Sequence, residues 1–196
     1  MAGLSEDYLK DAIEQFRSLR RLADRAIWQI TDRDLFAGAG GDSNSVAIIM
    51  KHMAGNMRSR WTDFLTSDGE KPDRNRETEF AIQDGDTPDS IRQRWQAGWH
   101  CLFQALETLS PDRLGATVVI RSEPHTVVRA INRQLTHYAY HVGQIVFLAK
   151  HWAGARWRSL SIPRGKSDDF TAAMRETWTA NPDARLGHET RHQEES

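Results

Sequence analysis

Apolar residues recur three or four positions apart along four long segments of the chain, and no segment alternates apolar and polar residues as strands do. The segments cover about residues 5–30, 43–66, 87–109 and 126–152. The last has the clearest pattern, which runs through Val128, Ile131, Leu135, Tyr138, Val142, Ile145, Ala149 and Trp152. Each segment therefore predicts an amphipathic helix with one buried face, and the fold class is predicted to be all-α.

Capping residues mark where these helices are expected to begin. Ser5 is a predicted N-cap of the first helix, and Ser43 or Ser45 a predicted N-cap of the second. Thr87 precedes a proline that would occupy the first helical position of the third. Four such helices with two longer connections predict a four-helix bundle, where sites are built from inward side chains of facing helices.

Two stretches between the predicted helices lack the helical pattern. Residues 67–86 are charged and contain Gly69, Pro72 and Gly85, so we interpret them as a long connection to which the sequence assigns no role. Residues 117–124 begin with four β-branched residues, but too little sequence surrounds them to make a sheet. We interpret this second stretch as an irregular crossover.

The pattern also predicts how the chain is divided. Residues 1–167 are expected to form the helical bundle domain, and residues 168–196 a C-terminal extension. Within that extension a short helix is predicted around residues 168–178, followed by a hydrophilic, flexible tail.

Composition and charge narrow the classes of function. Because 26 Lys and Arg face 27 Asp and Glu, the net charge of −1 argues against a nucleic-acid-binding protein that relies on a basic surface. The apolar run at residues 46–50 is far shorter than the roughly 20 residues that a membrane-spanning helix needs. The acidic N-terminus does not resemble a secretory signal, and a single cysteine cannot form an internal disulfide. We therefore expect a cytoplasmic protein that binds neither nucleic acid nor membrane.

Two histidines in the fourth predicted helix form a candidate metal site. His137 and His141 lie one helical turn apart, on a stripe beside the apolar one that also holds Gln134 and Gln144. Side chains one turn apart have Cβ atoms about 6 Å from each other, so both imidazoles can reach one metal ion. A single pair at this spacing also arises by chance, and the alternative is a set of hydrogen-bonded histidines at the edge of the core.

His52, in the middle of the second predicted helix, is the natural third ligand. Three neutral imidazoles leave a coordination position open on Zn²⁺ or Ni²⁺, an arrangement typical of catalytic rather than structural sites. Asn56 follows one turn after His52, and Asn56, Gln134 and Gln144 are candidates for orienting the ligands or a substrate. For each of these three amides the alternative is a packing or capping role.

Two other motifs compete with this site. His188 and His192 enclose a glutamate in the spacing of a zinc protease, but only four residues follow, and no apolar helix face flanks them. We interpret that motif as part of a solvated tail. Cys101 follows His100 directly, and consecutive helical residues point about 100° apart, so they do not form a nucleophile and its base.

The segments that carry the histidines are also familiar as sequences. Residues 132–145 (NRQLTHYAYHVGQI) and 49–57 (IMKHMAGNM) resemble the ligand helices of the DinB/YfiT-like superfamily of metalloenzymes, and residues 161–167 (SIPRGKS) resemble an uncharacterised branch of it. The resemblance extends over roughly residues 5–167. It implies a four-helix bundle with long crossover connections, a divalent metal ion on His52, His137 and His141, and a homodimer.

Members of that superfamily with assigned activities include thiol-dependent S-transferases and a thiol-dependent isomerase. The resemblance therefore implies a metal-dependent enzyme, for which an S-transferase that uses a low-molecular-weight thiol is one hypothesis. The alternative is a non-catalytic dimeric helical protein that binds a small ligand, with a vestigial or structural metal site. A shared fold does not transfer a substrate from one branch to another.

Overall fold

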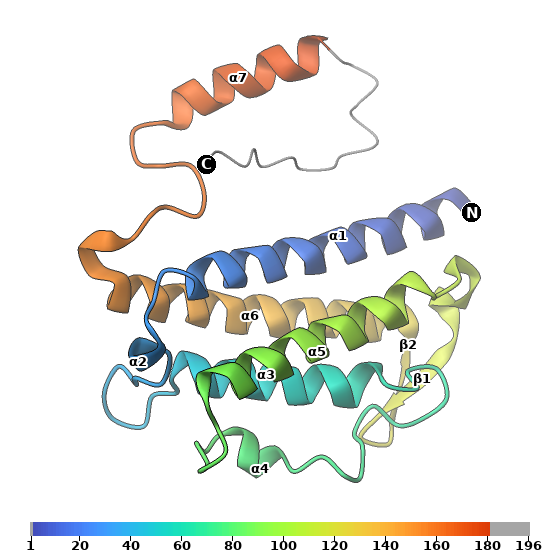
Figure 1. The fold of residues 1–196 in the computed structure, drawn as a ribbon. Coiled ribbons are helices and arrows are strands. Elements are labelled where there is room, and N and C mark those ends of the chain that lie inside the picture. Colours follow the sequence, from blue (N-terminus) through green and yellow to red (C-terminus); the bar gives the residue numbers. More distant parts are fainter. Residues whose placement is uncertain (1, 181–196) are drawn as a thin grey trace. The chain divides into compact units, whose positions relative to one another are not determined.

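Helices dominate the computed structural model, which describes residues 2–180 (Figure 1). The long helices are α1 (Ala2–Ile27), α3 (Val46–Trp61), α5 (Pro88–Glu107) and α6 (Val127–Ala153). The shorter elements are α2 (Asp32–Leu35), α4 (Arg76–Glu79), α7 (Ser167–Ala180), the strands β1 (Thr117–Ile120) and β2 (Glu123–Thr126), and the 3₁₀ turns Pro111–Gly115 and Gly154–Arg156. The prediction of an all-α protein is confirmed, and the four predicted segments correspond to the four long helices.

The chain divides into two compact units. Met1–Trp157 forms the first, and the second begins at Arg158 and contains α7. Within the first unit the long helices run side by side: α1 contacts α5 and α6, and α3 contacts the same two helices (Figure 1). The domain boundary after residue 167 and the bundle of DinB/YfiT-like type stay predictions.

Each long helix buries the apolar stripe that its sequence pattern predicts. Leu9, Ala12 and Phe16 of α1 are buried, as are Ile131 and Val142 of α6. α3 is buried around most of its circumference because α4, α5 and α6 all pack against it. No helix among residues 2–180 is both long enough and apolar enough to cross a membrane.

One aromatic residue from each long helix meets in the core. Phe16 of α1, Trp61 of α3, Trp99 of α5 and Tyr138 of α6 are at most 2% exposed. The ring centroids of Phe16 lie 6.0 Å from Trp61 and 5.8 Å from Tyr138, and those of Trp99 and Tyr138 lie 5.9 Å apart. Aromatic contacts of this kind add about 0.5–1.5 kcal/mol each beyond the area they bury.

Buried hydrogen bonds fix α3 against α6 at the same level. Trp61 Nε1 donates to the Tyr138 hydroxyl over 3.2 Å, and that hydroxyl donates to Asn56 Oδ1 over 3.0 Å. A slip of one helix along the other would leave these buried polar atoms unpaired, at a cost of about 1–3 kcal/mol for each. Since Tyr138 is adjacent to His137, this pairing also sets the height of the histidines.

The helix boundaries agree with most of the predicted caps. Ser45 accepts from the Ile48 N–H, and Thr87 forms a capping box with Ser90. The predicted cap at Ser5 is wrong, because α1 begins at Ala2 and Ser5 lies within it. Nothing in the three residues before Ser5 stops a helix, since alanine and leucine favour helices and one glycine is tolerated.

The interpretation of residues 117–124 as an irregular crossover is wrong. β1 and β2 pair antiparallel, with Thr117 opposite Thr126. Arg121 and Ser122 form the turn with φ values of 54° and 63°, a left-handed conformation that hairpin turns usually assign to glycine or asparagine. The Asp68 carboxylate accepts both of their N–H groups over 2.8 Å and so stabilises the turn. A partner more than fifty residues away leaves no local signal in the sequence.

The connection between α3 and α5 is packed against α3 and has a structural role. Lys51 Nζ donates to Ala81 O over 2.7 Å and forms an ion pair with Asp86, whose side chain is 2% exposed. Burial alone would raise the pKa of Asp86, but hydrogen bonds from Lys51, the Gln83 N–H and Arg94 outweigh it and hold the pKa below its ordinary value. The ion pair of Lys51 and Asp86 holds the connection against α3, next to His52.

Replacing Asp86 with asparagine is expected to destabilise the fold by about 3 kcal/mol at pH 7, because it leaves the buried Lys51 ammonium without its counterion. Folding lowers the pKa of Asp86. The carboxylate therefore contributes fully to the free energy of unfolding above its pKa in the unfolded chain, about 3.9, and this contribution is lost as the pH falls through its pKa in the folded protein. Urea unfolding between pH 7 and pH 3 measures the free energy of unfolding of the parent and Asp86→Asn proteins. The difference between these two free energies should shrink below pH 4. Asp73→Asn is the control, because Asp73 pairs with Arg58 at the surface. Such a pair contributes no more than about 1 kcal/mol to the free energy of unfolding. Equal losses for the two variants would contradict the argument.

Candidate metal centre

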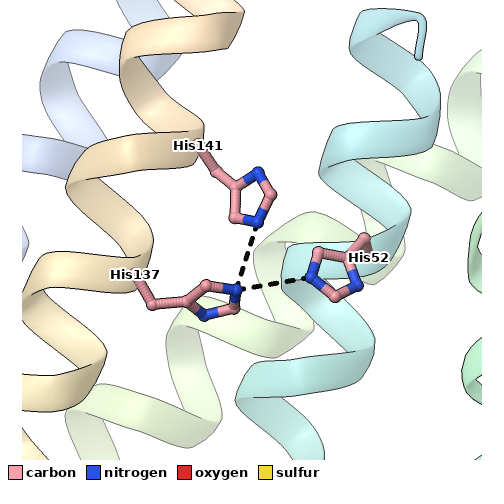
Figure 2. A group of neighbouring side chains, drawn as sticks. All are labelled: His52, His137 and His141. Atoms are coloured by element: carbon pink, nitrogen blue, oxygen red, sulfur yellow. Dashed lines mark hydrogen bonds between the residues drawn. The ribbon is translucent and has the colours of Figure 1, made fainter. Parts of the chain in front are cut away.

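Three histidine side chains from two helices converge on one point (Figure 2). His52 projects from α3, and His137 and His141 project from consecutive turns of α6. The Nε2 atom of His137 lies 3.4 Å from Nε2 of His52 and 3.1 Å from Nε2 of His141. One ring nitrogen from each residue lies within 4.8 Å of the other two, so the three histidines are close enough to hold a metal ion.

The spacing of these nitrogens fits a single divalent ion. Two ligands bound at 2.0–2.1 Å with tetrahedral angles lie roughly 3.3 Å from each other. The two measured Nε2 separations, 3.1 and 3.4 Å, lie on either side of that value. Two of the three nitrogen separations therefore agree with the binding of one metal ion by these histidines.

Hydrogen bonds behind two of the rings set which nitrogen carries the proton. His52 Nδ1 lies 2.9 Å from a Glu79 carboxylate oxygen, and His141 Nδ1 lies 2.8 Å from Gln144 Oε1. Both partners accept hydrogen bonds, so each Nδ1 is the donor, and in a neutral ring the Nε2 lone pair is then free. Two such lone pairs face the His137 ring, which has at most one Nε2 proton to share. A cation satisfies all three nitrogens at once.

Burial keeps His137 and His141 neutral. It is the main reason why the pKa of His137 falls to about 3, and the neighbouring His141 and His52 lower it further. Burial also lowers the pKa of His141, although the hydrogen bond to Gln144 acts in the opposite direction. Imidazoles bind metal ions in their neutral form, so these rings need not release a proton before they bind a metal ion near neutral pH.

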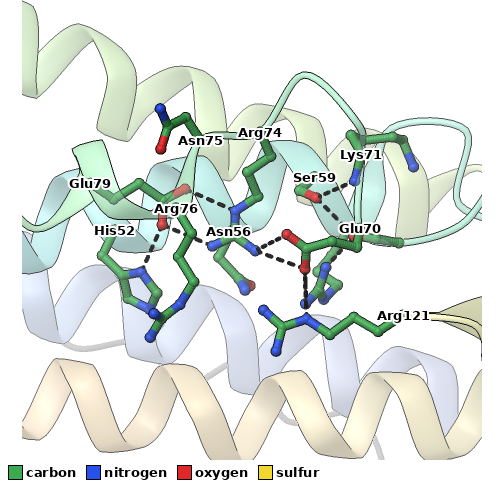
Figure 3. A network of polar contacts seen from close by, with 12 residues as sticks. His52, Asn56, Ser59, Glu70, Lys71, Arg74, Asn75, Arg76, Glu79 and Arg121 are labelled. Atoms are coloured by element: carbon green, nitrogen blue, oxygen red, sulfur yellow. Dashed lines mark hydrogen bonds and ion pairs between the residues drawn. The ribbon is translucent and has the colours of Figure 1, made fainter.

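Glu79 is held by a buried network of charges that the sequence did not predict (Figure 3). Both of its carboxylate oxygens accept from the Arg74 guanidinium over 2.8 Å, and the two side chains are 8% and 5% exposed. Burial would raise the pKa of Glu79, but hydrogen bonds from His52 and Arg74 outweigh it and hold the pKa below its usual value. Arg74 also pairs with Glu70, which in turn binds Arg121 of the hairpin turn. The long connection thus supplies the group that orients His52.

A glycine in α3 makes room for that carboxylate. A Cβ atom on Gly55 would overlap the Glu79 carboxylate group. Glycine weakens a helix by roughly 0.5–1 kcal/mol relative to alanine, so one in the middle of α3 needs a reason. This glycine, three residues after a ligand histidine, is the local signal that could have indicated a close approach from outside the helix.

The structure places the three predicted amide residues differently. Gln144 contacts His141 and donates through Nε2 to the Tyr140 hydroxyl over 3.1 Å, a partner that the sequence did not indicate. Asn56 accepts from Tyr138 and serves the packing of α3 against α6. Gln134 is 3% exposed, and its Oε1 atom has no hydrogen-bond partner among residues 2–180.

Of the two competing motifs, the pair His100 and Cys101 falls within the described residues. His188 and His192 lie outside the described residues. His100 is exposed on α5, whereas Cys101 is half-buried with its Sγ atom 3.5 Å from the Thr62 hydroxyl. The two neighbours therefore point apart, as the helical geometry predicted.

Replacing Glu79 with glutamine is expected to weaken metal binding by about 10–100-fold, the usual effect of removing a carboxylate that orients a histidine ligand. Glu77→Gln is the matched control, because Glu77 lies on the same helix with an 88% exposed side chain that pairs with Arg76 at the surface. Calorimetric titration of both variants and the parent protein with Zn²⁺ measures the difference. Equal affinities for all three proteins would show that Glu79 has no part in orienting His52.

Comparison with known proteins gives a family for this chain. No curated protein and no solved structure matches it. One family model matches residues 3–166, and its description reads "protein of unknown function (DUF1572)". The resemblance to the DinB/YfiT-like superfamily stays a prediction. Since the match covers most of the chain, the protein belongs to the DUF1572 family.

Proposed function

We propose that this protein is a metal-dependent enzyme that binds a divalent transition metal ion, Zn²⁺ or Ni²⁺, through His52, His137 and His141. The observation that carries the proposal is the convergence of three Nε2 atoms, with separations of 3.1 and 3.4 Å from the central His137. The hydrogen bonds of His52 and His141 support it further, because they direct both lone pairs toward that point.

The protein's own residues prepare the site for such an ion. Glu79 and Gln144 hold the Nδ1 protons of His52 and His141, and Arg74 keeps Glu79 ionised. Three protein ligands leave a position open for a substrate. A divalent ion held by His52, His137 and His141 would lower the pKa of a bound thiol or water and would so supply a nucleophile near neutral pH.

A low-molecular-weight thiol is the proposed co-substrate, and S-transfer the proposed reaction. The support is the resemblance of the two ligand helices to thiol-dependent members of the DinB/YfiT-like superfamily. Gln134 Oε1 is a buried acceptor without a hydrogen-bond partner among residues 2–180. The Tyr140 oxygen accepts from Gln144, which leaves its own O–H free to donate to a substrate. A cytoplasmic homodimer, which that resemblance and the composition favour, completes the proposal.

The second candidate is a non-catalytic helical protein that binds a small ligand, with a structural or vestigial metal site. Burial is the observation in its favour, because His52 and His141 are only 4% and 8% exposed. The Phe80 ring also covers His52, with the ring centroids 4.7 Å apart. A closed metal site suits structure better than chemistry.

Replacing His137 with alanine is expected to abolish metal binding, since the central nitrogen of the cluster is lost. Replacing His192 should leave the metal content unchanged, because the three converging histidines do not include it. Elemental analysis of untagged protein, purified without a metal-affinity step, measures both. The proposal is wrong if the parent protein contains less than a few tenths of an equivalent of metal and takes up none when metal is added. If only the His192 variant loses its metal, the metal ion binds at the His188 and His192 motif instead.

The enzyme and the binding protein differ in how the bound ion responds to thiols. In the Co²⁺ or Ni²⁺ form we expect a sulfur-to-metal charge-transfer band to appear when the co-substrate thiol joins the open position. Absorption spectra recorded during titration with common cellular thiols test this, and the His137→Ala protein treated in the same way is the control. If every thiol leaves the spectrum of the loaded protein unchanged, the non-catalytic candidate is favoured.

A further inference from the structure

A cavity lies beside the metal centre and is lined by none of its three histidines. It has a volume of about 500 Å³ and is bounded by α3, α5 and residues of the connection between them. This volume is within the range of about 300–1,000 Å³ that is typical of small-molecule sites. Its wall includes the small residues Ala54 and Ala97, as well as Gly55, which gives its space to Glu79, and Gly98, which packs against Ala54.

Positive charge predominates in the lining of this cavity. Five cationic side chains line it, namely Lys51, Arg58, Lys71, Arg74 and Arg94, against three carboxylates, Asp63, Asp73 and Glu79. Asp86 neutralises part of the charge of Lys51 and Arg94, but it is not among the lining residues and its side chain is 2% exposed. Arg58 pairs with Asp73 and Arg74 with Glu79, so Lys51 and Lys71 are the lining cations whose ammonium groups keep N–H bonds for a ligand.

Lys51 is the most deeply buried of these donors. Its side chain is 8% exposed, and its ammonium group donates to Ala81 O and to Asp86. An ammonium group has three N–H bonds, and the third has no acceptor among the residues that the structure describes. A buried donor without an acceptor is costly unless a ligand or water completes it.

We propose that this cavity is a binding site for a small anionic molecule, a carboxylate or a phosphate ester with a compact apolar body. The cationic lining recognises the anionic group, and Ala54 of α3 and Ala97 of α5 line the space for the body. Glu79 and Arg74 separate the cavity from the metal centre, since Glu79 contacts His52 and also lines the cavity. A bound anion thus lies next to the group that orients His52.

Cys101 provides a reporter inside the cavity. It is the only cysteine of the chain and one of the lining residues, so its alkylation is an unambiguous signal. Lys71 lies close enough for the two groups to interact electrostatically. Iodoacetamide reacts through the thiolate sulfur, which forms a carbon–sulfur bond as iodide leaves. A molecule that occupies the cavity should block this reaction.

The test is the rate of Cys101 alkylation, followed by intact-protein mass spectrometry, in the presence of inorganic phosphate or of benzoate. Chloride keeps the ionic strength constant. We expect one of these anions to slow the reaction in a saturable manner, about fivefold at four times its dissociation constant. Protection by phosphate alone would identify a phosphate ester as the ligand class, and protection by benzoate alone a carboxylate.

Substitutions of residues that line the cavity test whether the protecting anion binds there. Lys71→Gln is expected to weaken the protecting anion's affinity roughly tenfold, as the loss of one charge-assisted hydrogen bond does. Arg58→Gln, which changes a 74% exposed side chain of the lining, should also weaken the affinity for this anion. Lys10→Gln, which removes an exposed lysine on α1, is the matched control and should not change it. Absence of protection by both anions, or equal protection in the parent and Lys71→Gln proteins, would overturn the proposal.

This inference does not depend on the metal. The same protection is expected in the His137→Ala protein, because His137 does not line the cavity. Loss of metal binding and loss of anion protection are therefore separate outcomes. Protection that disappears in the His137→Ala protein would also overturn the proposal, since the anion would then bind at the metal centre.

Discussion

The hydrogen bond between His52 Nδ1 and Glu79 is the interaction on which the candidate metal centre depends. Glu79 comes from α4, in the connection after α3, and reaches His52 over the bare backbone of Gly55. Arg74 pairs with both carboxylate oxygens and keeps the group ionised in a buried place. The histidine is therefore fixed in its ring orientation and tautomer before any ligand arrives, and such preorganisation makes a metal site selective.

The rest of the fold holds the two ligand helices at the height that this interaction requires. Tyr138 of α6 accepts a hydrogen bond from Trp61 and donates one to Asn56, both on α3. Its neighbour His137 is consequently placed opposite His52. Ligands on packed helices are held more precisely than ligands on loops, so the Nε2 separations follow from the core as much as from the histidines themselves.

Local periodicity predicted the four long helices and placed the three histidines beside their buried stripes, but it left open whether these histidines hold a metal ion or are hydrogen-bonded residues at the edge of the core. His137 and His141 are one turn apart on α6, and His52 lies at the edge of the stripe of α3, so each side chain could be assigned to a core-facing position. The network behind His52 could not be predicted in this way, because Glu79 and Arg74 lie in a charged connection without periodicity. Likewise, the Arg121–Ser122 turn depends on Asp68, whose distance along the chain hides it from any local pattern.

Direct observation of a bound ion tests the central claim most closely. Crystals of zinc-loaded protein, with diffraction data collected on both sides of the zinc absorption edge, locate the ion by its anomalous signal. The account predicts one strong peak about 2.0–2.1 Å from the Nε2 atoms of His52, His137 and His141. A zinc peak at Cys101 or at the histidines of the tail, with none between these three rings, would contradict it.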